Sequence, residues 1–282
     1  MKRFAARTLA TGFAYPEGPR WHDGALWFSD QHAGVVHKLS PAGAHLDSFV
    51  VEGGPSGLGW MQDGCLLVVS MDGRKVLRRS AGRLEVHADL SALHRAQSND
   101  MVVLPSGRAY VGNIGFDFDH GEAPAATMLL LVEADGTVRN VADGLSCPNG
   151  MVVTPDGKVL IVAESLASRL TAFDIAADGG LCNRRVFADL PGHVPDGICL
   201  DAEGQVWCAS PFTRSAVRVR RSGDITARVD VDAGVFACML GGADGLDLFL
   251  CCSSSHARHE TVHLMTGRID VARVDVARAG WP

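Results

Sequence analysis

A phrase that recurs six times along the chain constrains the fold more than any other feature of the sequence. Each copy is a short apolar strand, a turn containing glycine and a second apolar strand, as in CPNGMVVTPDGKVLIVAES and VPDGICLDAEGQVWCASP. The spacings between copies are 39, 43, 50, 47 and 41 residues, and the copies open at Glu17, Ser56, Asn99, Asn149, Asp196 and Ala237. Repetition at this period indicates an array of similar supersecondary units.

The remainder of each repeat has room for two more strands, as in RLTAFDIAADG. Turns such as PDG and PSG between apolar runs are typical of hairpin connections. Six units of about four strands predict an all-β, six-bladed β-propeller, occupying residues 1–282 as a single domain. We expect residues 6–10 (ARTLA) to pair with residues 267–276 (GRIDVARVDV) and close the ring. The alternative, a barrel or sandwich, fits a shorter period.

Charge and composition exclude several classes of function. The net charge of −6 has no basic stripe, so we expect neither a nucleic-acid partner nor a membrane partner. The N-terminus lacks the apolar run of a signal peptide, and the expected location is cytoplasmic. The eight cysteines show no CxxC pair, which indicates buried reduced thiols. The oligomeric state is not predicted.

Propeller geometry brings the openings of the six phrases together, because the first strand of each blade lines the central channel. Glu17, Asn99, Asn149 and Asp196 should therefore converge near the axis on one face. Two carboxylates and two carboxamides supply hard oxygen ligands and a charge of −2, which suit a divalent cation such as Ca²⁺, Mg²⁺ or Mn²⁺. The alternative is that these residues only form turns.

The second strand of each blade returns to the face where the first began, so its last residue should surround the ring. These residues are Asp30, Asp72, Asn113 and Glu164, and they are expected to orient the ring residues or to be ordinary polar loop residues. The loop GFDFDHGEAPAATM begins two residues after Asn113 and should emerge on the same face. Its Phe116, Phe118 and His120 would cover the pocket, unless the loop is a surface decoration.

The motifs PEGP, PNG, PDG and CMLGG stand in an order that resembles the family of gluconolactonase, regucalcin (senescence marker protein) and related bacterial lactonases. The resemblance covers nearly the whole chain. It implies a six-bladed propeller that hydrolyses a small lactone with one divalent cation. It further implies Glu17, Asn149 and Asp196 as metal ligands, with Asn99 contacting metal or substrate. Ca²⁺ is the first choice of metal, and Mg²⁺, Mn²⁺, Zn²⁺ and Fe²⁺ are alternatives.

For the chemistry, Asp196 and Asn99 are the candidate catalytic residues, and Asp196 is the first choice of general base, ahead of Asp100. The candidate substrate-binding residues are Gln97, Asn113, Phe116 and His120. Sugar-lactone members of the family resemble R-x-N before the third-blade Asn, whereas this chain has Gln97-Ser98-Asn99. Without that arginine, and with Phe212 and Phe236 also expected near the metal, the pocket should favour a less polar lactone.

Other classes of function remain open on the sequence. A non-enzymatic calcium-binding or interaction propeller would use the same fold, and an esterase or phosphoesterase would use the same metal site. A serine hydrolase is disfavoured, because the chain has no G-x-S-x-G motif. The one Ser/His cluster, SSSHARH at residues 253–259, is interpreted as a polar loop between strands.

Overall fold

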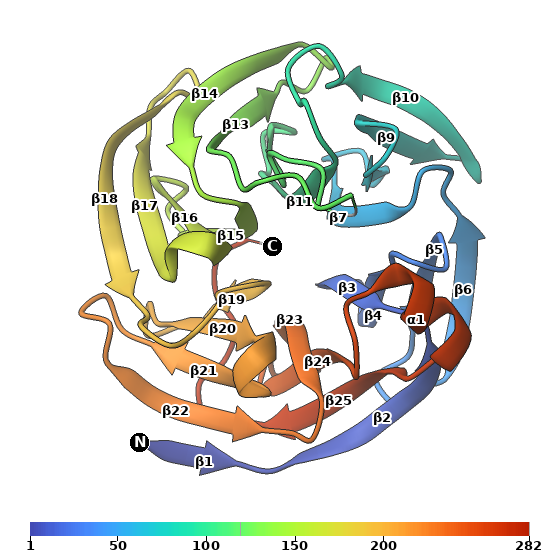
Figure 1. The fold of residues 1–282 in the computed structure, drawn as a ribbon, viewed down its shortest axis with the longest axis vertical. Helices are drawn as coiled ribbons and strands as arrows, with labels where there is room; N and C mark the ends of the chain where they lie inside the picture. The colour runs from blue at the N-terminus through green and yellow to red at the C-terminus, as the bar shows by residue number, and fades with distance from the viewer. Residues whose placement is uncertain (119, 282) are drawn as a thin grey trace.

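Six antiparallel sheets surround a central axis, as Figure 1 shows. This computed structural model describes residues 1–118 and 120–281. Each sheet contains four antiparallel strands, and one of them has a fifth, parallel strand at its edge. The all-β six-bladed β-propeller predicted from the repeat is confirmed.

The first four blades are each made of four consecutive strands. Blade one contains β3 (Pro16–His22), β4 (Ala25–Asp30), β5 (Val35–Leu39) and β6 (His45–Val50). Blade two contains β7 (Pro55–Trp60), β8 (Leu66–Ser70), β9 (Lys75–Ser80) and β10 (Arg83–Asp89). Blade three contains β11 (Ser98–Val103), β12 (Ala109–Asn113), β13 (Thr127–Val132) and β14 (Val138–Leu145). Blade four contains β15 (Pro148–Val153), β16 (Val159–Glu164), β17 (Arg169–Ile175) and β18 (Leu181–Asp189).

The last two blades both use strands from the N-terminus. Blade five contains β19 (Ile198–Leu200), β20 (Val206–Ser210), β21 (Ser215–Val219) and β22 (Ile225–Asp230), with β1 (Lys2–Phe4) parallel to β22. Blade six contains β23 (Gly234–Gly241), β24 (Asp247–Ser253), β25 (Gly267–Arg273) and β2 (Ala6–Phe13). The pairing of β2 with β25 confirms the predicted ring closure. It links the two ends of the chain and covers a sheet edge that would otherwise be exposed.

The hairpin between the first and second strands of a blade repeats its geometry around the ring. In blade four, Gly157 has φ +71° and donates its N–H to the carbonyl of Thr154 at 2.8 Å. The corresponding glycine of blade five, Gly204, has φ +70° and donates to Asp201 at 3.0 Å. A positive φ is inexpensive only for glycine, which explains why this turn residue recurs in every phrase.

The glycine that follows the phrase-opening residue has a different role, which is close packing between blades. A Cβ added at Gly150 would lie 2.5 Å from a backbone nitrogen of blade five, and one added at Gly197 would lie 2.4 Å from the Cβ of Ala237. No side chain fits at such distances, so glycine lets the inner strands of neighbouring blades approach. Blades three and six are exceptions, because Asp100 and Cys238 occupy this position.

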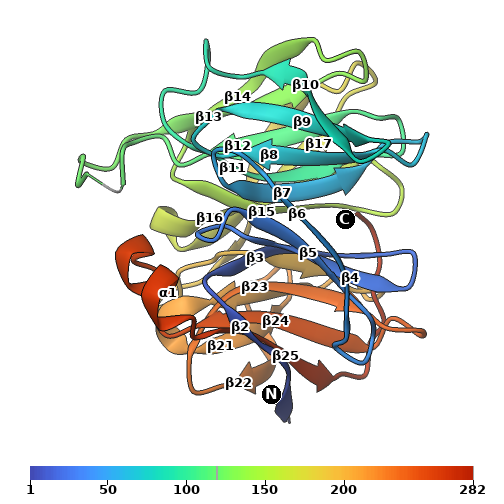
Figure 2. The ribbon, with the colours of Figure 1, turned by 90° about the vertical axis from the view of Figure 1, so that its right-hand side faces the viewer.

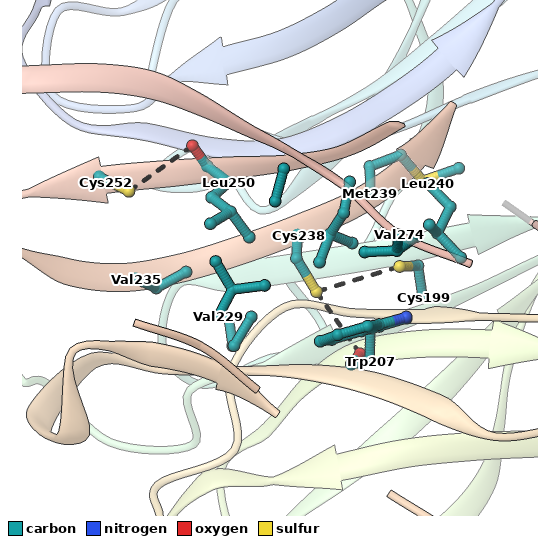
Figure 3. Close-up of a cluster of buried hydrophobic side chains, with 14 of the residues drawn as sticks. Cys199, Trp207, Val229, Val235, Cys238, Met239, Leu240, Leu250, Cys252 and Val274 are labelled. Atoms are coloured by element: carbon teal, nitrogen blue, oxygen red, sulfur yellow. Dashed lines mark hydrogen bonds between the residues drawn. The ribbon is translucent and has the colours of Figure 1, made fainter. Parts of the chain in front are cut away.

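Apolar side chains between neighbouring blades form the core. Figure 3 shows a cluster between blades five and six, where Trp207 is fully buried and the Sγ atoms of Cys238 and Cys199 are 4.0 Å apart. All eight cysteines are free, and five of them are buried. Their interpretation as reduced apolar residues is confirmed for these five, whereas Cys182 is exposed.

Two segments project from one face of the propeller, on the left in Figure 2. One is the loop that joins β12 to β13. The other joins β24 to β25. Residues 254–257 form the predicted loop between strands, and helix α1 (Arg258–Leu264) begins at the end of that motif. Two short 3₁₀ helices, η1 (Ser165–Ala167) and η2 (Pro211–Thr213), follow β16 and β20. Among the described residues, no helix has the length and apolar character needed to cross a membrane.

Candidate active site

A pocket of about 280 Å³ lies where the first strands of the blades begin. Its lining includes all four predicted ring residues, namely Glu17 of β3, Asn99 of β11, Asn149 of β15 and Asp196 just before β19. The other two phrase-opening residues are buried beside them: Ser56 donates a hydrogen bond to Asn99, and Ala237 packs in the core. The convergence expected from the repeat is therefore present.

Strand pairing explains this convergence. In blade one the start of β3 pairs with the end of β4, Pro16 opposite Asp30, and in blade four Pro148 pairs with Glu164 in the same way. The first strand of each blade is the inner one, and it begins on the face to which the second strand returns. A residue at the start of a first strand therefore lies near the axis and beside the loops of that face.

Short polar contacts hold three of the ring residues. The Gly18 N–H donates to Oε2 of Glu17 at 2.8 Å, and Ser56 Oγ donates to Oδ1 of Asn99 at 3.3 Å. Asn149 donates its Nδ2 to Ser165 Oγ at 3.3 Å, and Ser165 in turn donates to the carbonyl of Pro195 at 2.7 Å. With its nitrogen used in this way, Asn149 keeps its amide oxygen for a ligand in the pocket.

Among the described residues, seven acidic side chains are buried, and most have compensating partners. Four of them pair with arginine: Asp100 with Arg20, Glu164 with Arg169, Asp201 with Arg218, and Asp270 with Arg268. Asp30 accepts two backbone N–H groups. Glu17 and Asp196 form no ion pair with any described residue, and Oδ1 of Asp196 is buried without a hydrogen-bond partner there.

Because Glu17 and Asp196 are buried without an ion-pair partner, the pKa of each carboxyl group is raised. Burial, together with the charge of Asp100, raises the pKa of Glu17 to about 8. Burial raises the pKa of Asp196 well above its usual range, and the charges of Glu17 and Asp100 add to this rise. Burial also raises the pKa of the neighbouring Tyr15, with the same two ring carboxylates contributing. The pocket therefore contains two buried acidic groups that form no ion pair with an arginine or lysine among the described residues.

A hard divalent cation fits this arrangement. The donor set is two carboxylates and the amide oxygens of Asn99 and Asn149, which suits Ca²⁺, Mg²⁺ or Mn²⁺. No group of three or more His, Cys, Asp or Glu side chains in the described part of the chain forms a metal-binding cluster. The unpartnered Oδ1 of Asp196 is the atom that most needs a positive ligand.

The substrate-binding candidates divide into two groups. Gln97 and Phe116 line the pocket, together with Phe118. Asn113 does not, because its Nδ2 donates to the Met128 carbonyl at 3.1 Å and its Oδ1 accepts from Thr127 at 2.6 Å, within blade three. His120 is also outside the lining, 83% exposed and 2.9 Å from Asp117. Neither residue therefore lines the pocket, and a role of either in substrate binding stays a prediction.

Asp30 and Asp72, at the ends of second strands, do not contact the ring side chains that they were expected to orient. Asp30 accepts the N–H groups of Ala14 and Tyr15, just before Glu17, and so fixes the backbone rather than a ring side chain. Asp72 accepts a hydrogen bond from Gln97 at 2.8 Å. Asp100, the second choice of general base, is directed away from the pocket and pairs with the buried Arg20 at 2.7 Å.

Several lining residues were not predicted from the sequence. Tyr15 and Ser165 are adjacent to predicted residues, Glu17 and Glu164, and the repeat register is the signal that would have found them. His256 and Arg258 also line the pocket, although they belong to the segment between β24 and β25. Their location depends on the path of that segment across the face, for which the repeat contains no signal.

Comparisons with known proteins show what the whole chain is similar to. A family model described as the SMP-30/gluconolactonase/LRE-like region matches residues 15–254. The pentonolactonase XacC of Haloferax volcanii is 28% identical over 98% of this chain and 96% of its own length. Regucalcin of Danio rerio is 30% identical over 58% of this chain and 56% of its own. The crystal structure of a calcium-binding protein, regucalcin, from Agrobacterium tumefaciens superposes with a TM-score of 0.84 at 24% identity, over 100% and 98% of the two chains.

Proposed function

The chain belongs to the SMP-30/gluconolactonase/LRE-like family, and on this premise we propose that it hydrolyses a small lactone with the help of one divalent cation. The observation that carries the proposal is a pair of buried carboxylates, Glu17 and Asp196, in the pocket at the axis. Neither forms an ion pair with a cationic side chain of the described residues. The similarity to a pentonolactonase along almost the whole chain supports lactones as the substrate class.

The proposed metal ligands are Glu17, Asn149 and Asp196, with Ca²⁺ as the first candidate and Mg²⁺, Mn²⁺, Zn²⁺ and Fe²⁺ as alternatives. When bound, the cation would supply Lewis acidity at the carbonyl oxygen of the lactone. The Gly18 N–H and Ser165 Oγ hold Glu17 and Asn149 in position, so these two ligands need little reorganisation.

Asp196 is the proposed general base. One oxygen of the Asp196 carboxylate would hold the cation, and the other accepts a proton from the water that attacks the lactone carbonyl carbon. The ring C–O bond of the resulting tetrahedral species then breaks, and the proton passes to the alkoxide oxygen that leaves. The product is an open-chain hydroxy acid. Asn99, whose Oδ1 accepts from Ser56, has its Nδ2 left to donate a hydrogen bond to the substrate.

The aromatic residues of the lining have a complementary role. Phe116 and Phe236 are both almost fully buried, and they exclude water from the side of the pocket where they lie. Such a wall supports the expectation of a less polar lactone. The arginine missing two residues before Asn99 does not leave the pocket without one, because Arg258 is part of its lining.

Metal removal and reconstitution test the proposal. The metal-free protein should hydrolyse neither sugar lactones nor alkyl lactones, and adding back Ca²⁺, Mg²⁺, Mn²⁺, Zn²⁺ or Fe²⁺ singly should restore one or both activities. A variant with Glu17, Asn149 and Asp196 all changed to Ala should purify without the metal. Asp63→Ala, at an exposed acid outside the pocket lining, is the control and should retain it. Unchanged metal content in the triple variant would refute the ligand assignment.

The same experiment separates the alternatives. A non-enzymatic calcium-binding or interaction propeller would bind the cation and hydrolyse nothing, and an esterase or phosphoesterase would act on open-chain esters or phosphate esters in preference to lactones. The cytoplasmic location and the single-domain organisation stay predictions from the sequence.

A further inference from the structure

The pocket lining mixes apolar and polar side chains. Its apolar members include Phe118 and Phe212, whose rings lie 6.0 and 6.1 Å from that of His256. Asp72 and Arg258 give the lining a polar side towards blades one and two. The polar side combines the end of β8 with a helix from blade six, so it is assembled from segments far apart in the sequence.

Helix α1 is anchored over blades one and two. Its Thr261 Oγ1 lies 2.6 Å from Nδ1 of His32, which follows β4 in blade one. The His32 ring stacks on Tyr15 with a centroid separation of 4.3 Å. At the first residue of the helix, Nη1 of Arg258 lies 3.4 Å from Oδ2 of Asp72. The contact between Thr261 and His32 positions the helix, and the contact between Arg258 and Asp72 orients the arginine side chain at the pocket.

Most of the donors of Arg258 are available to a ligand. A guanidinium has five N–H groups, and Asp72 takes one of them in a contact at the long end of hydrogen bonding. The side chain is 48% exposed, so a ligand in the pocket can reach it. Gln97 donates to the other oxygen of Asp72 at 2.8 Å, which holds the carboxylate in place.

The Arg258–Asp72 pair is suited to a hydroxyl group. The guanidinium donates and the carboxylate accepts, and a hydroxyl can do both in return. Asp72 also offsets the charge of the arginine, and Glu17 and Asp196 lie in the same pocket, so an anionic substituent gains less from this side than a neutral one. The chemistry matches a neutral hydroxylated substituent on the lactone.

We propose that Arg258, oriented by Asp72, is a specificity-determining residue that binds a hydroxyl group of the substrate. The inference rests on the proposed lactone hydrolysis and adds to it which residue selects among lactones. Arg258 would then replace the arginine missing two residues before Asn99, because it reaches this side of the pocket from blade six.

The test compares two lactones that differ only in their hydroxyl groups: a pentono-γ-lactone and γ-valerolactone, the analogue in which every hydroxyl is replaced by hydrogen. Arg258→Met keeps the unbranched stem and removes every donor. The ratio of kcat/KM for the hydroxylated lactone to that for γ-valerolactone should fall about tenfold, mainly through KM. Arg258→Lys should recover part of the ratio, because an ammonium still donates.

Two further variants control the result. Arg95→Met removes another exposed arginine that pairs with a single carboxylate, Glu122, outside the pocket lining, and should leave the ratio unchanged. Asp72→Asn should lower the ratio, and its effect should not add to that of Arg258→Met, since the two residues act together.

The outcomes distinguish the two proposals. If the wild-type protein hydrolyses lactones and Arg258→Met lowers kcat/KM for both substrates by the same factor, the arginine only supports the fold and the inference is overturned. If the wild-type protein with restored metal hydrolyses neither lactone, the proposed function is overturned, and the inference that rests on it is withdrawn as well.

Discussion

Glu164 and Asp196 are both buried acids on the pocket face of the propeller, but their pKa values are shifted in opposite directions. Glu164 accepts hydrogen bonds from the Ser146 N–H, from Thr171 and from Arg169. Although burial raises its pKa, these bonds outweigh burial and hold the pKa below its usual range. Asp196 has an oxygen without a partner among the described residues, and burial raises its pKa.

The difference separates structural carboxylates from functional ones. Glu164 connects the strands of blade four, and its charge is neutralised within the fold. Without a ligand, Asp196 and Glu17 must either keep a desolvated charge or take up a proton, as their raised pKa values indicate, and both cost stability. A buried charge left uncompensated in a pocket indicates that an external group completes the site.

The largest expected effect tests the functional side of this comparison. Asp196→Ala should lower kcat for lactone hydrolysis on the order of 10³-fold, about 4 kcal/mol of transition-state stabilisation, because the variant loses a metal ligand and the proposed base. The measurement is kcat at saturating metal and substrate. Asp100→Asn, at a buried acid paired with Arg20 outside the pocket lining, should retain the kcat of its folded fraction. Wild-type turnover in a folded Asp196→Ala protein would make the site structural.

A smaller effect compares the two acids directly in metal-free protein. Glu164→Gln should lower the free energy of unfolding by about 2–3 kcal/mol, since charged hydrogen bonds to a buried group are lost. Asp196→Asn should raise it, on the order of 1 kcal/mol, because an uncompensated buried carboxylate is removed. Denaturant unfolding with a chelator present measures both. The same sign for the two variants would contradict the comparison.

The last effect is a change in pH dependence. The pKa of Glu17 is about 8 in the folded protein against 4.5 as its ordinary value, so the metal-free folded state binds the proton more tightly. Its free energy of unfolding should therefore fall as pH rises from 4.5 to 8, by at most about 1.4 kcal/mol per pH unit from this group. Glu164 acts in the opposite sense: its contribution is present above its unfolded pKa and is lost as pH falls through the lowered folded value.

Unfolding profiles of metal-free wild type and Glu17→Gln check this prediction. The variant should show a shallower fall between pH 4.5 and 8 than the wild type. Identical slopes would mean that Glu17 is not the group responsible.

Much of the fold and part of the site could be predicted without coordinates, because they depend on local rules. The hairpin glycines and the alternation of apolar strands set the blades, and the register of the repeat brought Glu17, Asn99, Asn149 and Asp196 to one pocket. The pairing of β2 with β25 followed from the need to complete the last blade.

Contacts between distant segments were decided only by the tertiary structure. Asn113 occupies the predicted position in the repeat, yet its side chain bonds to Thr127 in the neighbouring strand instead of lining the pocket. Arg258 lies in the pocket because α1 crosses from blade six to contacts at His32 and Asp72. The sequence determined which residues begin the inner strands, because the spacing of the six repeats fixes those positions. Which side chains then meet across the face depends on the paths of the loops and on the packing of other blades. The sequence repeat contains no signal for either.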